Sequence, residues 1–313
     1  MTTIRKRIVK AAFFFLFLGF WIVLLFSLPY PKSFAYQTTK DDCYNHGLWI
    51  YQRLYQNPKP VDIAFIGSSR IIHAVQDSLL EKMWADTLHH PFHVLNLGYC
   101  RPGRNMDYFF LKEIIETKHP KTVILEVREL EDRISHPMFP YLADAEDIYV
   151  SPTVWNRKYL SDCFAALIAR RDYWMSRVIR ETPTQVSIPN TDFGYPETNL
   201  TTDSVVLKDR YIQIRNRHPT ELAVALAEQF PLAWLNRIKR LGQEHGVKIY
   251  FLYLHGYGTI EKFPAHPEWY SNLLIPPDSI FINQNNWMDP DHLNNNGAKQ
   301  MAKFLRDALA EEN

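Results

Sequence analysis

The sequence has few cysteines and almost no net charge, and both shortages exclude classes of protein. Its 313 residues include three cysteines, too few for a disulfide scaffold, and none belongs to a close Cys-x-x-Cys pair of the kind that binds zinc. The 35 Lys and Arg residues nearly balance 34 Asp and Glu residues, which gives a net charge of +1. Because this balance provides no general attraction for polyanions, a protein that binds nucleic acid through bulk charge is excluded.

Glycine-rich catalytic and phosphate-binding motifs are also missing. The chain has no Gly-x-x-x-x-Gly-Lys-Ser/Thr loop, and no Gly-x-Gly-x-x-Gly follows its first predicted strand. The Gly-x-Ser-x-Gly elbow of α/β-hydrolases is absent too, because Ile71 stands where the second glycine would be. We therefore expect neither of these nucleotide sites nor a standard α/β-hydrolase site.

A single long apolar run lies near the start of the sequence, at residues 11–28. As a helix it would extend about 27 Å at roughly 1.5 Å per residue, close to the roughly 30 Å hydrocarbon core of a bilayer. Because positive charges before a span are retained in the cytoplasm, we expect a cytoplasmic segment at 1–10, a transmembrane anchor at 11–28 and an exported remainder, periplasmic or extracellular. The flanking residues are Arg5, Lys6, Arg7 and Lys10 before the run and Pro29 and Pro31 after it.

The same apolar run is also compatible with a cleaved signal peptide or with a buried helix of a soluble protein. A signal peptide would need a small-x-small cleavage site, and residues 33–35 (Ser-Phe-Ala) match that pattern poorly. A buried helix fits less well with the flanking charges. In an oxidising compartment two of Cys43, Cys100 and Cys163 can pair, and the sequence leaves the pair undetermined.

The exported part shows the alternating pattern of an α/β domain. We expect a linker and a first short helix at 29–60 and one domain at 61–313, with helical periods between its apolar runs. Strands that alternate with helices indicate a parallel sheet covered by helices on both faces. The alternation fails at about 130–220, which predicts an inserted, partly helical subregion. The predicted strands are residues 61–66, 93–97, 122–127, 247–254 and 279–282.

Three polar segments carry the candidate chemistry. Residues 67–70 (Gly-Ser-Ser-Arg) end the first strand, and residues 96–104 end the second. Asp289 stands three residues before His292, a spacing that lets a carboxylate contact an imidazole and fix its tautomer. Alone, each segment is equally typical of a turn, a helix cap or a packing histidine. Together they predict a site at the carboxyl edge of the sheet, where parallel strands present their ends.

These segments resemble the motif blocks of the SGNH (GDSL-like) hydrolase superfamily. Residues 66–70 match the first block, residues 96–103 the second, and residues 289–297, with Asp-x-x-His followed by Leu and Gly, the last. The Gly-Ser-Ser form with one leading span is similar to exported, membrane-anchored members, including the D-alanyl transfer protein of teichoic acid modification. The resemblance implies a three-layer, flavodoxin-like α/β domain, and it does not cover the insertion.

The resemblance also implies roles for individual residues. It makes Ser69 the nucleophile, His292 the general base and Asp289 the residue that orients His292. The backbone N–H groups of Ser69 and Gly103 would bind the oxyanion, with Gly98 as the alternative to Gly103 because the loop is longer than the usual form. This chemistry attacks an ester or thioester carbonyl, forms an acyl-enzyme, and needs no metal or other cofactor.

One departure from the superfamily concerns its third block, Gly-x-Asn-Asp. This chain has Glu-Val-Arg-Glu at residues 126–129 instead, so the asparagine donor is missing. The loss of one oxyanion donor costs about 2.7–4 kcal/mol of transition-state stabilisation, unless Arg128 or another group replaces it. We also expect Arg70, Arg101, Arg104 and Arg128 to bind substrate, because basic residues beside the site would attract an anionic polymer.

The sequence therefore predicts a membrane-anchored serine acyl-ester hydrolase or O-acyltransferase that acts on a cell-envelope polysaccharide or another hydroxyl acceptor. An integral membrane protein that supplies the acyl donor is a further expected partner, and nucleic acid is not. The alternative is a non-catalytic envelope protein that kept the fold and binds glycan or aids assembly; the altered third block favours it. Its binding surface would be the aromatic residues of the insertion, Trp155, Tyr159, Tyr173 and Trp174. We expect His73 and His255 to pack around the cleft.

Overall fold

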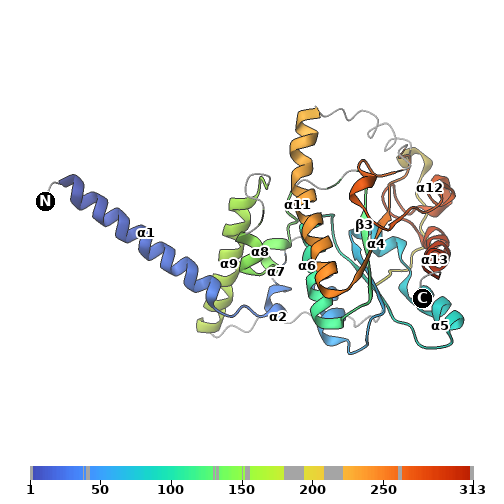
Figure 1. Ribbon diagram of the computed structural model, residues 1–313, viewed down its shortest axis with the longest axis horizontal. Helices are drawn as coiled ribbons and strands as arrows, with labels where there is room; N and C mark the ends of the chain where they lie inside the picture. The colour runs from blue at the N-terminus through green and yellow to red at the C-terminus, as the bar shows by residue number, and fades with distance from the viewer. Residues whose placement is uncertain are drawn as a thin grey trace.

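The chain folds as an α/β domain with one long apolar helix at its N-terminal side (Figure 1). The computed structural model describes residues 3–37, 39, 43–129, 131, 134–149, 151, 156–179, 194–207, 221–259 and 263–310. Trp155 and most of the polar stretch between residues 180 and 204 fall outside this description.

A five-stranded parallel sheet forms the centre of the domain, in the order β2-β1-β3-β4-β5. The central strands are buried on both faces, as expected for a parallel sheet with helices on each side. This arrangement confirms the predicted α/β class and the first four predicted strands. The strands are β1 Ile63–Gly67, β2 Val94–Gly98, β3 Thr122–Val127, β4 Lys248–Tyr253 and β5 Leu273–Leu274.

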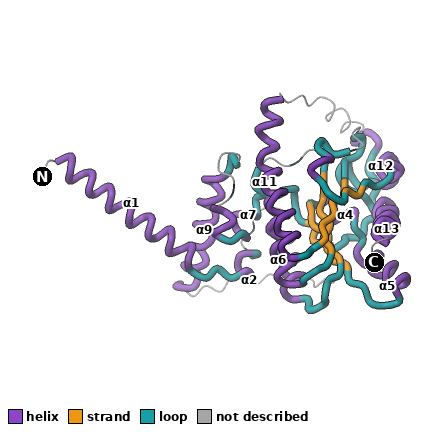
Figure 2. Tube along the Cα trace, in the orientation of Figure 1, coloured by secondary structure: helices purple, strands orange, loops and turns teal. Residues whose placement is uncertain are grey.

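Helices cover the two faces of the sheet and enclose two separate apolar cores (Figures 1 and 2). Helices α6 (Arg104–Lys118) and α11 (Glu221–His245) pack together on one face. On the other face are α4 (Ser69–Ala74), α5 (Asp77–Leu88), α12 (Asp278–Ile282) and α13 (Asn295–Ala310). Two layers of helix around one sheet are what the alternating sequence pattern predicts.

The prediction of a fifth strand at 279–282 was wrong, because these residues form the short helix α12. The segment begins after Pro277, which precedes the helix in an extended conformation, and Asp278 supplies an acidic first turn. Three apolar residues are too few to distinguish a strand from a helix by periodicity. The edge strand is the two-residue β5, which precedes this helix.

The stretch predicted as an insertion is partly helical over its described residues, as predicted. It contains α7 (Phe139–Leu142), α8 (Ala145–Tyr149) and α9 (Tyr159–Ile179). The segment before the domain contains α2 (Lys32–Ala35), α3 (Cys43–Tyr51) and a π-helix at Gln52–Gln56. Residues 204–207 are also helical, and short 3-10 turns lie at Pro267–Trp269 and Gln284–Asn286.

The first helix, α1 (Thr3–Ser27), extends away from the rest of the molecule (Figure 1). Over Ile4–Ser27 it is long and apolar enough to cross a membrane. Most of its large apolar side chains are exposed, among them Phe13, Leu16 and Phe17.

Candidate active site

The first strand and helix α4 bring Ser69 to the carboxyl edge of the sheet. Gly67 is the last residue of β1, and Ser69 is the first residue of α4. Ser68 caps this helix, because its Oγ accepts a hydrogen bond from the N–H of Arg70 at 3.2 Å. A Cβ on Gly67 would come within 2.5 Å of Glu126 and 2.6 Å of Ile71, so only glycine fits this turn. The turn therefore presents Ser69 at a helix N-terminus, a position where negative charge is stabilised.

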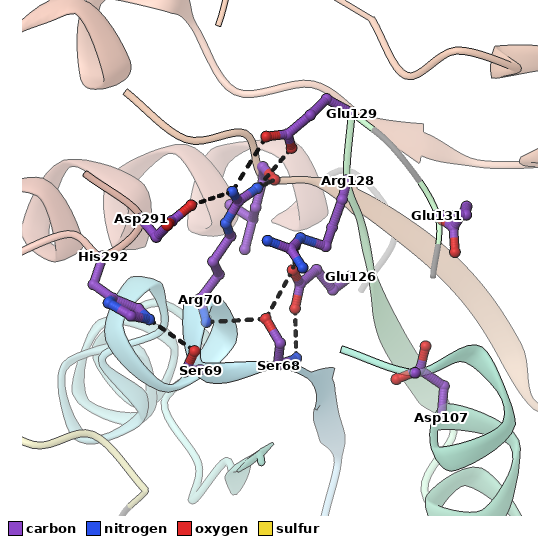
Figure 3. A network of polar contacts seen from close by, with 12 residues as sticks. Ser68, Ser69, Arg70, Asp107, Glu126, Arg128, Glu129, Glu131, Asp291 and His292 are labelled. Atoms are coloured by element: carbon purple, nitrogen blue, oxygen red, sulfur yellow. Dashed lines mark hydrogen bonds and ion pairs between the residues drawn. The ribbon is translucent and has the colours of Figure 1, made fainter. Parts of the chain in front are cut away.

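The side chains of Ser69, His292 and Asp289 form one hydrogen-bonded chain. His292 Nε2 lies 2.7 Å from Ser69 Oγ (Figure 3). On the other side of the ring, His292 Nδ1 lies 2.7 Å from Asp289 Oδ2. Ser69 and His292 are 223 positions apart in the sequence, and the fold brings the three residues together in the order that a serine nucleophile, a base and an orienting carboxylate require.

Asp289 is held in this geometry by the turn that precedes α13. Its Oδ1 accepts the backbone N–H groups of Asp291 at 2.8 Å and His292 at 3.0 Å. Burial alone would raise the pKa of Asp289, but the hydrogen bond and charge of His292 outweigh it and lower the pKa below its ordinary value. The carboxylate therefore stays ionised and fixes the proton of the imidazole on Nδ1, leaving Nε2 to accept from Ser69.

Asn96 is a site residue whose role the sequence did not reveal. It is fully buried in β2, and its side-chain amide donates to the carbonyl oxygens of Ile71, Ile72 and Val75 at 3.1, 3.3 and 2.8 Å. Ile71 and Ile72 belong to α4, and Val75 is its C-cap, so these carbonyls lie at the end of the helix, where only that of Ile71 also accepts a backbone N–H, from Val75. Asn96 thus ties the helix that carries Ser69 to the neighbouring strand.

The structure distinguishes the candidate oxyanion donors. The N–H of Gly98 donates to Asn96 Oδ1 at 2.9 Å, so Gly98 is already engaged, contrary to its place as an alternative donor. No hydrogen bond within the described part of the chain uses the N–H of Ser69 or of Gly103. Gly103 caps helix α6 and lines a small pocket together with Ser68. Ser69 and Gly103 therefore remain the candidate donors.

The pocket beside Ser68 is lined by charged groups of both signs, mainly acidic ones: Arg104, Asp107, Glu126, Arg128 and Glu131. Burial raises the pKa of Asp107 to about 8, although the Arg104 charge opposes this shift. Glu126 accepts the backbone N–H of Ser68, and at 3.0 Å the Ser68 hydroxyl. Arg128 Nε lies 3.5 Å from Glu126 Oε1, and the Arg128 side chain remains 22% exposed. Arg128 is thus the cation that faces this pocket from the position of the missing third block (Figure 3).

Arg70 is buried, in contrast to the expectation that it binds substrate. Its guanidinium donates to both oxygens of Glu129, to the carbonyl of Leu254 and to Asp291 (Figure 3). Only 3% of its side chain is exposed. Burial opposes the charged form, but Glu129 and Asp291 raise the pKa of Arg70 above its ordinary value. Arg70 therefore joins α4 to the loops after β3 and β4 and before α13.

Arg104 is likewise occupied by protein partners, while Arg101 is not buried. Arg104 pairs with Asp107 at 2.8 Å and with Glu131, and its side chain is 3% exposed. Arg101 is exposed and adopts a left-handed φ of 51° in the loop between β2 and α6. Of the four arginines expected to bind substrate, Arg101 and Arg128 have side chains that solvent can reach.

Two other histidines lie near the site. The ring of His73 is 5.0 Å from that of His292, and burial, aided by the charge of His292, lowers the pKa of His73 to about 4. His255 is buried against Phe281, with 4.1 Å between ring centroids, and burial lowers its pKa as well. Both rings are therefore neutral near pH 7. They pack beside the site, as expected for His73 and His255.

Among the described residues, no cluster of three or more His, Cys, Asp or Glu is arranged to hold a metal ion. Cys100 is disulfide-bonded, whereas Cys163 on α9 is a free thiol. Comparison with known proteins adds no relative: no family model matches the sequence, and no curated protein matches it significantly.

Proposed function

We propose that this chain is a membrane-anchored, exported serine acyl-ester hydrolase or O-acyltransferase that acts on a cell-envelope polysaccharide. The observation that carries the proposal is the unbroken chain Ser69–His292–Asp289, with 2.7 Å at each step. Helix α1 supports the anchor because it is long and apolar enough to span a bilayer. The parallel sheet with helices on both faces agrees with the three-layer fold of the SGNH superfamily, to which the motif blocks point.

The reaction begins with proton transfer from Ser69 Oγ to His292 Nε2 as Oγ attacks the carbonyl carbon of an ester or thioester. The imidazolium then gives this proton to the departing alcohol or thiol, which leaves Ser69 acylated. Water, deprotonated by His292, then attacks the acyl carbon; the bond to Ser69 Oγ breaks, Oγ takes the proton back from His292, and a carboxylic acid is released. Attack by a sugar hydroxyl instead transfers the acyl group to that hydroxyl.

The oxyanion of each tetrahedral intermediate needs donors that are not already used. In the proposal these are the N–H groups of Ser69 and Gly103, with the Arg128 guanidinium in place of the absent asparagine. Arg128 suits this role because it lines the same pocket as Gly103 and stays partly exposed. A cation near the developing charge acts as an oxyanion donor does, by stabilising the transition state more than the ground state.

A fluorophosphonate probe tests the proposal on the full chain in detergent micelles. The proposal expects a covalent adduct on the wild type that is lost in Ser69→Ala and kept in Ser68→Ala, the matched control in the same turn. No adduct on a folded wild type would instead favour the non-catalytic glycan-binding alternative, which the altered third block at residues 126–129 supports. An aryl acetate with and without oligosaccharide then separates the two enzymes, because a transferase yields acetylated sugar in place of free acetate.

A further inference from the structure

The outward face of helix α9 is apolar near both ends of the helix. Five large side chains on it are exposed to solvent by about half or more, and the exposed ion pair of Arg171 and Asp172 lies between the two groups in the sequence. The exposed fractions are 81% for Leu160, 64% for Phe164, 49% for Met175, 75% for Val178 and 59% for Ile179. Since scattered apolar residues are normal on a protein surface, the feature that needs explanation is their concentration on one face of one helix.

The opposite face of α9 buries charged and small residues, whereas its large apolar residues are exposed. The residues that it buries against the rest of the protein are Asp162, Ala166, Ala169 and Arg170. Asp162 accepts a hydrogen bond from Asn156 at 2.9 Å, and Arg170 donates to the carbonyl of Ala143 at 3.3 Å. A surface helix of a soluble protein places its apolar side inward. The reversal in α9 therefore indicates an apolar environment outside the protein.

Helix α9 also lies beside the C-terminal end of α1. This is the end at which α1, if it spans a bilayer, would leave the hydrocarbon core on the exported side. The Arg170 guanidinium lies 4.6 Å above the ring of Phe26, near the C-terminal end of α1. Tyr173 contacts Tyr30 and Phe34, the residues that follow, with ring centroids 5.9 and 4.9 Å apart. Figure 1 shows α9 on the side of the domain from which α1 emerges. A bilayer that contains α1 would therefore have its exported surface next to α9.

We propose that α9 is an interfacial helix, whose outward face inserts into the exported leaflet of the bilayer that α1 spans. The inference rests on the membrane anchor of the proposed function. Interfacial helices bury an apolar face about 5–10 Å into the boundary between headgroups and acyl chains. Arg171, which is 54% exposed and pairs with Asp172 at 2.6 Å, fits this position, because a long basic side chain extends its charge back to the headgroups. Lipid is the expected occupant because the apolar face adjoins a membrane helix.

This contact gives the anchor a second attachment point. A single helix leaves a domain free to rotate above the membrane, whereas α1 and α9 together hold it by two helices that contact each other through Phe26 and Arg170. The orientation of the sheet relative to the bilayer would then be fixed, and with it the distance of Ser69 from the membrane surface. An acyl donor embedded in the bilayer would meet the site at one constant height.

Spin labels on the full chain in pure phospholipid vesicles test this inference. Single cysteines are introduced at Phe164, Val178 and Ile282 in a Cys163→Ser background, which removes the free thiol. Ile282 is the matched control because it is an exposed apolar residue, 73% accessible, on α12 at the far side of the molecule from α1. A fourth label at Phe17 reports whether α1 is in the bilayer. Collision with oxygen, which enters lipid, is compared with collision with a nickel chelate, which stays in water.

The inference expects F164C and V178C to lose nickel accessibility and gain oxygen accessibility relative to I282C, with F17C deepest of all. Equal nickel accessibility at 164, 178 and 282, with F17C in lipid, would overturn the inference and leave the anchor intact. A water-exposed F17C would overturn the anchor itself. Protection of 164 and 178 only in native membranes, and not in pure lipid, would also overturn the inference in favour of a protein partner. Circular dichroism melting curves confirm that each labelled variant keeps the fold.

Discussion

Ser69 and Arg70 are neighbours in the chain, yet they belong to two regions of opposite character. Ser69 forms a hydrogen-bonded chain with His292 and Asp289, here called the reactive chain. Its three side chains are half-buried, so solvent can reach them. Arg70 joins a buried ion network with Glu129 and Asp291. A second network pairs Arg104 with Asp107 and Glu131, and all three residues line the pocket beside Ser68.

The difference indicates a division of labour at one sheet edge. Buried arginines whose hydrogen bonds are taken by carboxylates stabilise the loops but have little left to offer a substrate. The groups of the reactive chain are accessible and can contact a substrate. Arg128 lies between the two cases, because it is close to Glu126 and is still partly exposed. Breaking the reactive chain should therefore change catalysis with little change in stability, and breaking the ion network should do the reverse.

The largest expected effect is that of Ser69→Ala. Removal of the nucleophile from a complete triad lowers turnover by roughly 10⁶-fold, because no other group can form the acyl-enzyme. Ser68→Ala should instead cost about 1 kcal/mol of stability through loss of the helix cap. The measurement is hydrolysis of an aryl acetate together with the thermal midpoint of each variant. Similar turnover in both variants would show that the reactive serine lies elsewhere.

Asp289→Asn is expected to lower turnover by about 10⁴-fold, because the amide no longer fixes the proton on Nδ1 of His292. Asp291→Asn, two residues along, is the matched comparison, since Asp291 bonds to Arg70 and not to the imidazole. This control should lose stability and retain most of its turnover. The aryl acetate assay measures both, and an equal fall in turnover would contradict the separation of the two regions.

Arg128→Ala should lower turnover by about 10²–10³-fold, the usual effect of losing one oxyanion donor. Arg101→Ala is the control, because Arg101 is an exposed arginine of the loop that ends at Gly103. The reduction should fall on kcat and kcat/KM alike, since the charge acts in the transition state. A variant that changes only KM would assign Arg128 to ground-state binding of substrate instead.

Glu129→Gln should lower stability by roughly 2–3 kcal/mol at pH 7 and leave the reactive chain intact. Burial alone would raise the pKa of Glu129, but the Arg70 charge and hydrogen bonds lower it to about 2. A carboxyl whose folded pKa is depressed adds stability above its unfolded pKa, and that stability is lost as the pH falls toward the folded pKa. Urea unfolding should therefore show the gap between wild type and variant closing between about pH 4.5 and 2. A gap independent of pH would contradict the ion pair.

The sequence was sufficient for the first four strands of the sheet, since glycines mark where β1 and β2 end and β-branched residues form most of β3. The local spacing of Asp289 and His292 also pointed to their contact, whereas the choice of Ser69 rested on the resemblance of residues 66–70 to the first motif block. The helix at 278–282 was missed because a run of three apolar residues carries no period.

The partners of the arginines could not be predicted from the sequence. Glu129 lies 59 residues from Arg70, and Glu131 lies 27 residues from Arg104, so only the fold shows that their charges are paired and buried. The partners of Asn96 could not be predicted either, because its side chain in β2 donates to carbonyls at the end of α4, more than 20 residues away in the sequence. A signal was present in hindsight, since a polar residue in the middle of an apolar strand must find partners when buried.

The most direct test of the account is to trap the acyl-enzyme. The full chain is mixed with an aryl ester, quenched in acid during turnover, and digested for peptide mass spectrometry. The account predicts one acyl group, attached to Ser69, that is absent from Ser69→Ala and does not form in His292→Ala. Turnover with the acyl group on another residue, or turnover with no covalent acyl group at all, would contradict it.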